Sequence, residues 1–280
     1  MKFSVLGPEG TFTDAAAKLY LQNHQKLNAV IDYQSSFNRV YEALKEEEIG
    51  LLPIENQLDG YVMPTLQRLM SSPVNIIDEI TIPVNFGLVA NVSDIKSIKR
   101  IFVQFKTEGQ CQKLLNKISS AEIINTSSNI ISLQKFQNGT AGDAAIIPQM
   151  EMAKLHYPVM ENNVADQANN YTRFIIFKVK SASNKQLETK ELGTFRFKSS
   201  LFVTPSVNDQ PGTLYNILGF FAKAQLNLVT LMSLPTKDTL GVYSFYIELS
   251  GTTSQKEVLF KTITQLENQY HVKLLGYYSA

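Results

Sequence analysis

The sequence predicts an α/β protein followed by a smaller α+β domain. Over residues 1–180, short apolar runs alternate with amphipathic helical patterns, as they do in sheets whose strands are connected by helices. Over residues 196–280, the predicted elements follow the order βαββαβ. Residues 181–195 between them mix both signs of charge and contain few large apolar side chains, which predicts a linker.

The elements of residues 1–180 are predicted from periodicity. A helix begins at Ser36, because the apolar side chains that follow recur at the spacing of one helix face. Residues 74–91 form a long extended segment in which Pro83 predicts an edge or a bend. The other predicted strands are Lys2–Leu6, Leu51–Ile54, Arg100–Val103, Ile123–Thr126, Ala144–Pro148 and Thr172–Val179. The other predicted helices are Thr13–Gln25, Thr107–Ile118 and Ser128–Gln137.

The C-terminal elements follow from the same signals. Alternating apolar and polar side chains predict strands, and a capping box of Ser254 and Glu257 predicts the start of a helix that ends near Gln269. The other predicted elements are the strands Ser199–Pro205, Leu226–Leu231, Gly241–Leu249 and His271–Tyr277 and the helix Pro211–Lys223.

Composition excludes several classes of function. The chain has 280 residues, 44% of them hydrophobic, which is enough for one large or two ordinary domains with real cores. Its 26 Lys and Arg against 25 Asp and Glu create no field that would attract nucleic acid or an anionic membrane. The single cysteine, Cys111, and the three histidines lack metal-ligand spacing. We expect no zinc or iron–sulfur site and no transmembrane helix, and a cytoplasmic location.

Three polar segments are candidates for chemistry. Gly7–Thr13 lies between a strand and a helix, where backbone N–H groups favour an anion such as a carboxylate or phosphate. Taken alone, a tight turn with an N-cap from Thr11 or Thr13 explains every residue type in it. At the end of a buried strand, Glu55 and Asn56 lie where α/β sheets bind ligands, or Asn56 simply forms the turn with Asp59 and Gly60.

The third segment is Asp166–Phe174, the densest polar cluster directly before an apolar strand. Arg173 can clamp a carboxylate, and Thr172 can present a hydroxyl to a leaving group. A solvated loop closed by an ordinary strand would look the same, so both interpretations stay open. Cys111 is assigned no catalysis, because no histidine near it in the sequence could activate it.

Together these motifs resemble the prephenate dehydratase family over essentially the whole chain. The matching segments are G-x-x-G-T-x-T at Gly7–Thr13, P-I-E-N at Pro53–Asn56, Gln110–Cys111, the strand Ala144–Ile146 and N-x-T-R-F at Asn170–Phe174. The C-terminal βαββαβ unit, with Pro211-Gly212-x-Leu214 and Leu226-Asn227-Leu228, resembles the ACT domain that follows the catalytic domain in that family.

The resemblance implies a fold and an activity. It implies a catalytic domain at residues 1–180 with two lobes like those of a periplasmic binding protein, roughly 1–80 with 160–180 and 81–159. The ACT regulatory domain would be residues 196–280. The implied lyase reaction, which needs no cofactor, is the decarboxylating dehydration of prephenate to phenylpyruvate in L-phenylalanine biosynthesis. The implied assembly is a homodimer or homotetramer under allosteric regulation by L-phenylalanine.

The resemblance also assigns roles to residues. The implied catalytic residues are Thr172, Asn56 and Gln110. The implied substrate-binding residues are Thr11, Thr13, Glu55, Arg173 and Phe174. Phenylalanine would bind at the turn before a helix and on the neighbouring strand, at Gly212, Leu214, Asn227 and Leu228, where backbone N–H groups meet apolar side chains.

The chain departs from the family pattern at several positions. Gln57 replaces a serine, Val103 replaces an active-site serine, and Met232 and Leu234 replace a charged pair of the ACT domain. We therefore expect Val103→Ser to raise activity or leave it unchanged, and phenylalanine to inhibit weakly. Two alternatives stay open: a catalytically weakened homologue that senses amino acids or binds a ligand, and an arogenate dehydratase.

Overall fold

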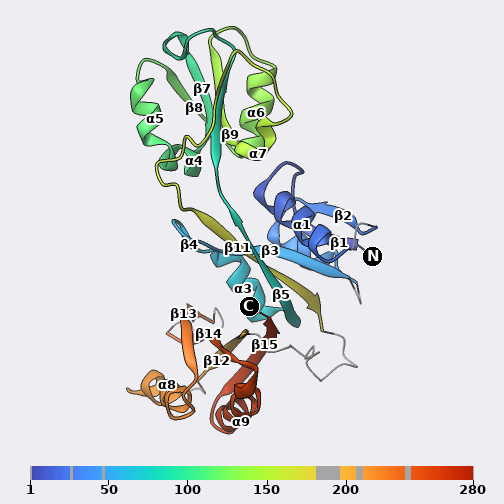
Figure 1. Cartoon of the computed structure of the whole chain (residues 1–280). Helices are drawn as coiled ribbons and strands as arrows, with labels where there is room; N and C mark the ends of the chain where they lie inside the picture. Colours follow the sequence, from blue (N-terminus) through green and yellow to red (C-terminus); the bar gives the residue numbers. More distant parts are fainter. Residues whose placement is uncertain are drawn as a thin grey trace.

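The computed structural model describes residues 2–25, 28–45, 48–180, 196–205, 211–236 and 241–279. Figure 1 shows three parts along one long axis: a first lobe in the middle, a second lobe at the top and a C-terminal unit at the bottom. The predicted linker, residues 181–195, lies outside the described residues. Helices combine with two sheets, so the fold is mixed α/β, as predicted.

The first lobe is a sheet with helices on both faces. It contains β1 (Lys2–Leu6), α1 (Phe12–Asn23), β2 (Val30–Gln34), α2 (Phe37–Glu42), β3 (Ile49–Asn56), β4 (Gly60–Tyr61), α3 (Met63–Ser71), β5 (Val74–Pro83) and β11 (Tyr171–Val179). The strand order is β5-β11-β3-β1-β2, with β4 beside β3. Successive residues of β3 serve opposite faces: Leu51 packs with α1, whereas Leu52 packs with α2 and α3.

The second lobe repeats this three-layer arrangement. It contains β6 (Phe86–Ala90), the 3-10 helix η1 (Ile95–Ser97), β7 (Arg100–Gln104), α4 (Phe105–Gln110), α5 (Gln112–Lys117), β8 (Glu122–Thr126), α6 (Asn129–Gln137), β9 (Asp143–Pro148), α7 (Gln149–Met152) and β10 (Val159–Glu161). The strand order is β10-β6-β9-β7-β8. Leu114 and Leu115 of α5 cover one face, and Leu133 and Phe136 of α6 cover the other.

The C-terminal unit has the predicted βαββαβ order. It contains β12 (Arg196–Thr204), α8 (Thr213–Lys223), β13 (Asn227–Pro235), β14 (Tyr243–Thr252), the 3-10 helix η2 (Thr253–Gln255), α9 (Lys256–Glu267) and β15 (His271–Ser279). The strands form an antiparallel sheet in the order β13-β14-β12-β15. Helices α8 and α9 bury Phe221 and Leu259 against one face of this sheet.

The other face of the C-terminal sheet packs on the first lobe. Tyr246 and Leu275 share a core cluster with Leu69 of α3. At the end of the same helix, Lys273 Nζ donates hydrogen bonds to backbone carbonyls, at 2.8 Å for Leu69. The C-terminal unit is therefore attached to the first lobe by a common apolar core and by polar contacts at its edge. In addition, β15 pairs with β5 at Gly276 and Ile76, which joins the strands of the two parts into one sheet.

The chain passes between the lobes in two segments, and these segments lie side by side. Val84 N, just after β5, donates to the carbonyl of Asn170, just before β11, at 2.8 Å. The lobes also touch through Phe12 and Phe86, whose ring centroids are 5.5 Å apart in an edge-to-face arrangement. Asn170 thus lies in the hinge between the lobes.

The structure corrects several predicted elements. Pro83 ends β5 at a bend into the second lobe, as predicted. The predicted helix 107–118 is wrong, because Cys111 divides it into α4 and α5. The predicted capping box is also wrong: Thr252 and Gln255 form it, at the start of η2. The sequence analysis missed β2, β4, β10, α3 and α7.

Candidate active site

Four polar side chains meet at the hinge between the lobes. Asn56 Nδ2 lies 2.9 Å from both Asn170 Oδ1 and Thr172 Oγ1, and Asn170 Nδ2 donates to Gln110 Oε1 at 3.1 Å. We call Asn56, Gln110, Asn170 and Thr172 the hinge cluster. It joins β3 and β11 of the first lobe to α4 of the second. The distances within it therefore depend on the orientation of the two lobes relative to each other.

Asn56 is held by both ends of its side chain. Its Oδ1 accepts from the backbone N–H groups of Leu58 and Asp59, at 3.0 and 2.9 Å, which forms the turn after β3. Its Nδ2 donates to the hinge cluster. The interpretation of this motif as a turn is therefore correct, and the turn also fixes the orientation of the Asn56 amide.

A β-bulge determines which residues at the end of β3 lie opposite β11. Pro53 has no N–H for the ladder, and the register with β11 shifts between Arg173 and Phe174 so that Phe174 pairs with Pro53. Asn56 then lies directly opposite Thr172. The P-I-E-N sequence places the amide beside the hydroxyl in this way.

Gln110 is positioned by the break between two helices. Asp166, in the segment that returns to β11, accepts from the backbone N–H groups of Gln112 and Lys113 at 2.9 and 2.8 Å, which caps α5. Its own N–H donates to the Gln110 carbonyl at 2.7 Å. The break at Cys111 thus ties Gln110 to the hinge segment.

Thr172 is oriented as a hydrogen-bond donor. Its oxygen accepts from Asn56 Nδ2, and among the described residues its hydroxyl donates to no partner. The side chain is nearly buried, with 8% of the residue exposed. A hydroxyl whose oxygen accepts in this way still has its own proton to donate to a bound group.

Two cavities lie between the lobes. One, of about 250 Å³, is lined by Thr11 and Phe12 of the first lobe and by Gln104, Ser128 and Asn129, among others, of the second. The other cavity, of about 590 Å³, borders the hinge cluster and is lined in part by Gln110, Asp59 and Lys106. Its volume is within the range of small-molecule sites.

The start of α1 differs in part from the prediction. Thr11 is the N-cap, since its Oγ1 accepts from Asp14 N at 3.3 Å, and it also lines the smaller cavity. Thr13 is buried in the helix and is not among the residues lining that cavity. The Asp14 carboxylate accepts from the Gly10 N–H at 2.9 Å, so a protein carboxylate already occupies part of the predicted anion position.

Arg173 does not face the cleft, which corrects the predicted carboxylate clamp. Its guanidinium donates five hydrogen bonds of 2.7–3.1 Å, all to the protein carboxylates of Glu55, Glu79 and Glu248. Because side chains alternate along a strand, Thr172 and Arg173 point to opposite faces of β11. Glu55 is engaged by Arg173, and Phe174 is buried in the core against α1, so neither is placed to bind substrate.

Val103 also lies outside the cleft, contrary to expectation. It is 0% exposed in the core between the second-lobe sheet and α5. The next residue, Gln104, lines the smaller cavity instead and caps α4 through its Oε1, which lies 2.9 Å from Lys106 N.

Val103→Ser is therefore expected to destabilise the protein rather than raise its activity. The change removes two methyl groups from a packed core and buries a hydroxyl, which lowers the free energy of unfolding by about 2 kcal/mol. Urea denaturation measures it, with the exposed Val229→Ser as the control. An unchanged midpoint for Val103→Ser would contradict the core placement.

Several site residues were not selected from the sequence. Asn170 was quoted in a motif but given no role, although its position two residues before Thr172 puts it on the same face of the chain. The sequence indicated only the start of a helix after a strand at Gln104, Ser128 and Asn129. Asp59 accepts weakly from Gln110 Nε2, at 3.5 Å, and was assigned only to the turn.

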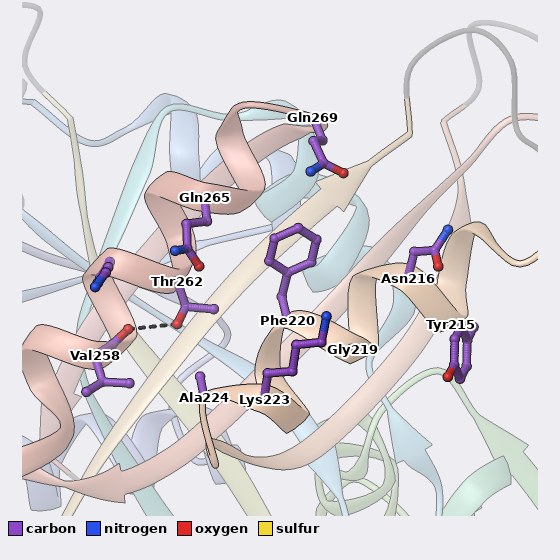
Figure 2. Close-up of a pocket in the computed structure, with 11 residues that line it drawn as sticks. Tyr215, Asn216, Gly219, Phe220, Lys223, Ala224, Val258, Thr262, Gln265 and Gln269 are labelled. Atoms are coloured by element: carbon purple, nitrogen blue, oxygen red, sulfur yellow. Dashed lines mark hydrogen bonds between the residues drawn. The ribbon is translucent and has the colours of Figure 1, made fainter.

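The predicted effector residues lie at the starts of α8 and β13 in the C-terminal unit. Gly212 has φ +91°, which favours glycine, and begins α8. Leu214 and Leu228 pack on its core, and Asn227 Nδ2 donates to Ser250 Oγ at 3.3 Å. None of these four residues lines the separate groove of about 680 Å³ between α8 and α9, which Figure 2 shows.

The described ranges contain no group of three His, Cys, Asp or Glu side chains arranged to hold a metal. They also contain no helix long and apolar enough to cross a membrane. Burial raises the pKa of the Cys111 thiol to about 12, so this thiol is protonated at neutral pH.

Comparison with known proteins gives a consistent result. The family model described as prephenate dehydratase matches residues 3–182. The prephenate dehydratase of Methanocaldococcus jannaschii is 28% identical over 280 residues, covering 97% of this chain and 95% of that protein. The structure of prephenate dehydratase in complex with L-Phe from Arthrobacter aurescens has a TM-score of 0.82 at 28% identity, covering 100% of this chain and 90% of that chain.

A second solved structure agrees over the full length. The prephenate dehydratase of Staphylococcus aureus has a TM-score of 0.80 at 26% identity and is covered completely, as is this chain. The family match includes β3, α4 and β11, the elements that carry the hinge cluster. Because that match spans well over half of the sequence, the chain belongs to the prephenate dehydratase family.

Proposed function

We propose that the cleft between the lobes converts prephenate to phenylpyruvate, water and CO2, a lyase reaction of L-phenylalanine biosynthesis. The observation that carries this proposal is the orientation of Thr172. Its oxygen accepts from Asn56, and none of the described residues accepts its proton, so the hydroxyl is available to donate to a bound substrate. A positioned donor is what a departing hydroxide requires.

The reaction needs little more than this donor. In prephenate, the bond between the ring and its carboxylate breaks, and that electron pair enters the ring as CO2 leaves. The carbon–oxygen bond at position 4 breaks at the same time, and the oxygen leaves with its electron pair and takes up one proton from hydronium or buffer in the solvent, so that it departs as water. Because the ring becomes aromatic, the enzyme has only to stabilise the departing oxygen, and Thr172 supplies that hydrogen bond.

The substrate also carries two carboxylates. Two helix starts flank the smaller cavity: Thr11 caps α1, and Ser128 caps α6 through a hydrogen bond from Ile131 N at 3.2 Å. Helix starts favour negative charge. Lys106 lines the larger cavity near Gln110 and supplies a cation there. These groups replace Arg173 in the proposed binding of substrate.

The direct test is an assay of the purified protein with prephenate. We expect saturable formation of phenylpyruvate, followed by its ultraviolet absorbance. Arogenate supplied in place of prephenate distinguishes the alternative dehydratase, which would form phenylalanine. If calorimetry showed prephenate binding without any product, the chain would be a binding or sensing homologue.

We further propose that residues 1–180 are the catalytic domain and that residues 196–280 are an ACT domain that binds L-phenylalanine. The βαββαβ order and the antiparallel sheet support the ACT assignment. A homodimer or homotetramer is part of the same proposal, and a cytoplasmic location stays a prediction of the sequence. Leu234, at a position that is charged in the family, is buried against the first lobe, which supports weak inhibition.

Phenylalanine is expected to bind at Gly212 and Asn227, and Asn227→Asp is expected to abolish this binding. A new carboxylate beside the bound carboxylate of the amino acid repels it. Asn227 is exposed, so the protein stays folded. Calorimetry measures the heat of binding, with Gln269→Glu in the groove between α8 and α9 as the matched control. Loss of heat only in the Gln269 variant would move the site to that groove, and no heat in the parent would contradict regulation by phenylalanine.

A further inference from the structure

A buried charge cluster lies behind the hinge cluster, on the other face of the same strands. Arg173 of β11 contacts Glu55 of β3, Glu79 of β5 and Glu248 of β14. Glu79 also accepts from Lys198 Nζ of β12 at 2.7 Å. The cluster therefore joins three strands of the first lobe to two strands of the C-terminal unit.

Both clusters are built on one pair of neighbouring positions. Asn56 pairs with Thr172 across β3 and β11, and the adjacent residues Glu55 and Arg173 pair with each other. Because alternate residues face opposite sides of a sheet, the first pair carries the hinge cluster and the second carries the charges. A shift of Arg173 displaces the backbone of Thr172 directly, since the two residues share a peptide bond.

Glu248 is the most buried member of the charge cluster, with 1% of the residue exposed. It accepts from Arg173 Nη2 at 2.7 Å and also from Tyr246 and Thr230, each at 2.9 Å. Burial alone would raise the pKa of its carboxyl, but Arg173 and the hydrogen bonds outweigh burial and hold that pKa below its usual range. Glu248 is thus a fixed anion that the C-terminal unit supplies to the strand carrying Thr172.

A second contact also links the C-terminal unit to the strands of the first lobe. Tyr61, which pairs with Glu55 across β3 and β4, lies 2.5 Å from Thr230 Oγ1 of β13. The register between β13 and β14 shifts between Leu228 and Thr230, and Thr230 then pairs with Glu248. This irregularity places two polar side chains of the C-terminal unit against β3 and β11.

We propose that Glu248 is a positioning residue for the dehydration, which acts through Arg173 to hold Thr172 opposite Asn56. This inference rests on the proposed function. Glu248 is not a catalytic residue, because its contacts lie on the face of β11 opposite to Thr172. The C-terminal unit therefore supports the active site from the face of β11 opposite to Thr172.

The central test is Glu248→Gln, which keeps the shape of the side chain and removes its charge. A misplaced catalytic group lowers the rate of the chemical step, so we expect kcat to fall about 10- to 100-fold while KM stays within about threefold. The matched control is Asp143→Asn. Asp143 is also 1% exposed and is paired with an arginine, Arg100, in the second lobe, away from the hinge cluster. The control should lose stability but keep its kcat.

Hydrogen exchange supplies a readout that does not require turnover. In Glu248→Gln, amide exchange of the peptide covering residues 170–174 should become about tenfold faster, while residues 143–148 of β9 stay unchanged. Asp143→Asn should show the opposite pattern. Tyr246→Phe, which removes one donor to Glu248, should produce a smaller effect of the same kind and serves if Glu248→Gln does not fold.

Three results would overturn the proposal. They are an unchanged kcat in folded Glu248→Gln, a kcat that falls equally in both carboxylate variants in step with their stability, and unchanged exchange at residues 170–174. If the parent protein fails to convert prephenate, the proposed function fails, and hydrogen exchange alone then decides whether Glu248 positions β11.

Discussion

Thr172→Ala is expected to lower kcat about 10²- to 10³-fold and to leave KM within about twofold. The hydroxyl interacts with the departing oxygen mainly as the carbon–oxygen bond breaks, so its loss raises the barrier more than it weakens binding. Asn56 Nδ2 keeps Asn170 as a partner at 2.9 Å, and Asn56 Oδ1 keeps the backbone hydrogen bonds that form the turn after β3. Steady-state kinetics with prephenate measure the effect.

Thr172→Ser provides the control for this result. It retains both the oxygen that accepts from Asn56 and a hydroxyl proton that can be donated, so its kcat should stay within about tenfold of the parent. Circular dichroism and the melting temperature establish that both variants are folded. A Thr172→Ala variant with nearly parental kcat would show that another group stabilises the leaving hydroxide.

The resemblance to a family implied that Asn56, Gln110 and Thr172 belong to one site. The structure explains how the chain brings them together. Asn56 and Thr172 follow local signals, a strand end and a strand start, which depend on neighbouring residues and can be read from the sequence. The helix break that positions Gln110 was not predicted, because the sequence indicated one continuous helix there. The distances that join the three residues depend on the hinge and could not be predicted.

The role of Arg173 could not be predicted, because it depends on partners far away in the sequence. Glu248 lies 75 residues away along the chain and belongs to the C-terminal unit. Strand alternation places Thr172 and Arg173 on opposite faces, but it does not say which face borders the cleft. The motif therefore suggested two cleft residues where the structure has one.

Val103 was misplaced for a related reason. Its position relative to Gln110 matches an active-site serine of the family, but a valine at that position packs into the core of the second lobe. The spacing between Val103 and Gln110 indicates where the backbone of residue 103 lies, but it does not indicate which way the side chain points. The physical chemistry of the side chain decides which surface it joins.

Arg173→Gln is expected to lower the free energy of unfolding by about 3–5 kcal/mol. The change leaves Glu55, Glu79 and Glu248 close together with Lys198 as the cation that remains in contact with one of them. Uncompensated carboxylates in a buried site repel one another and lack solvation. Chemical denaturation followed by circular dichroism gives the value.

The matched control is Arg100→Gln, which also removes a guanidinium from a buried carboxylate. The Arg100 side chain is 40% exposed and contacts one carboxylate, so water replaces part of the lost interaction and the loss should be smaller. The double variant Arg173→Gln with Glu248→Gln should recover part of the stability, because it removes the most buried of the unpaired charges. Equal losses for the two arginine variants, or a double variant less stable than Arg173→Gln alone, would show that the charge cluster does not hold β11 to the C-terminal unit.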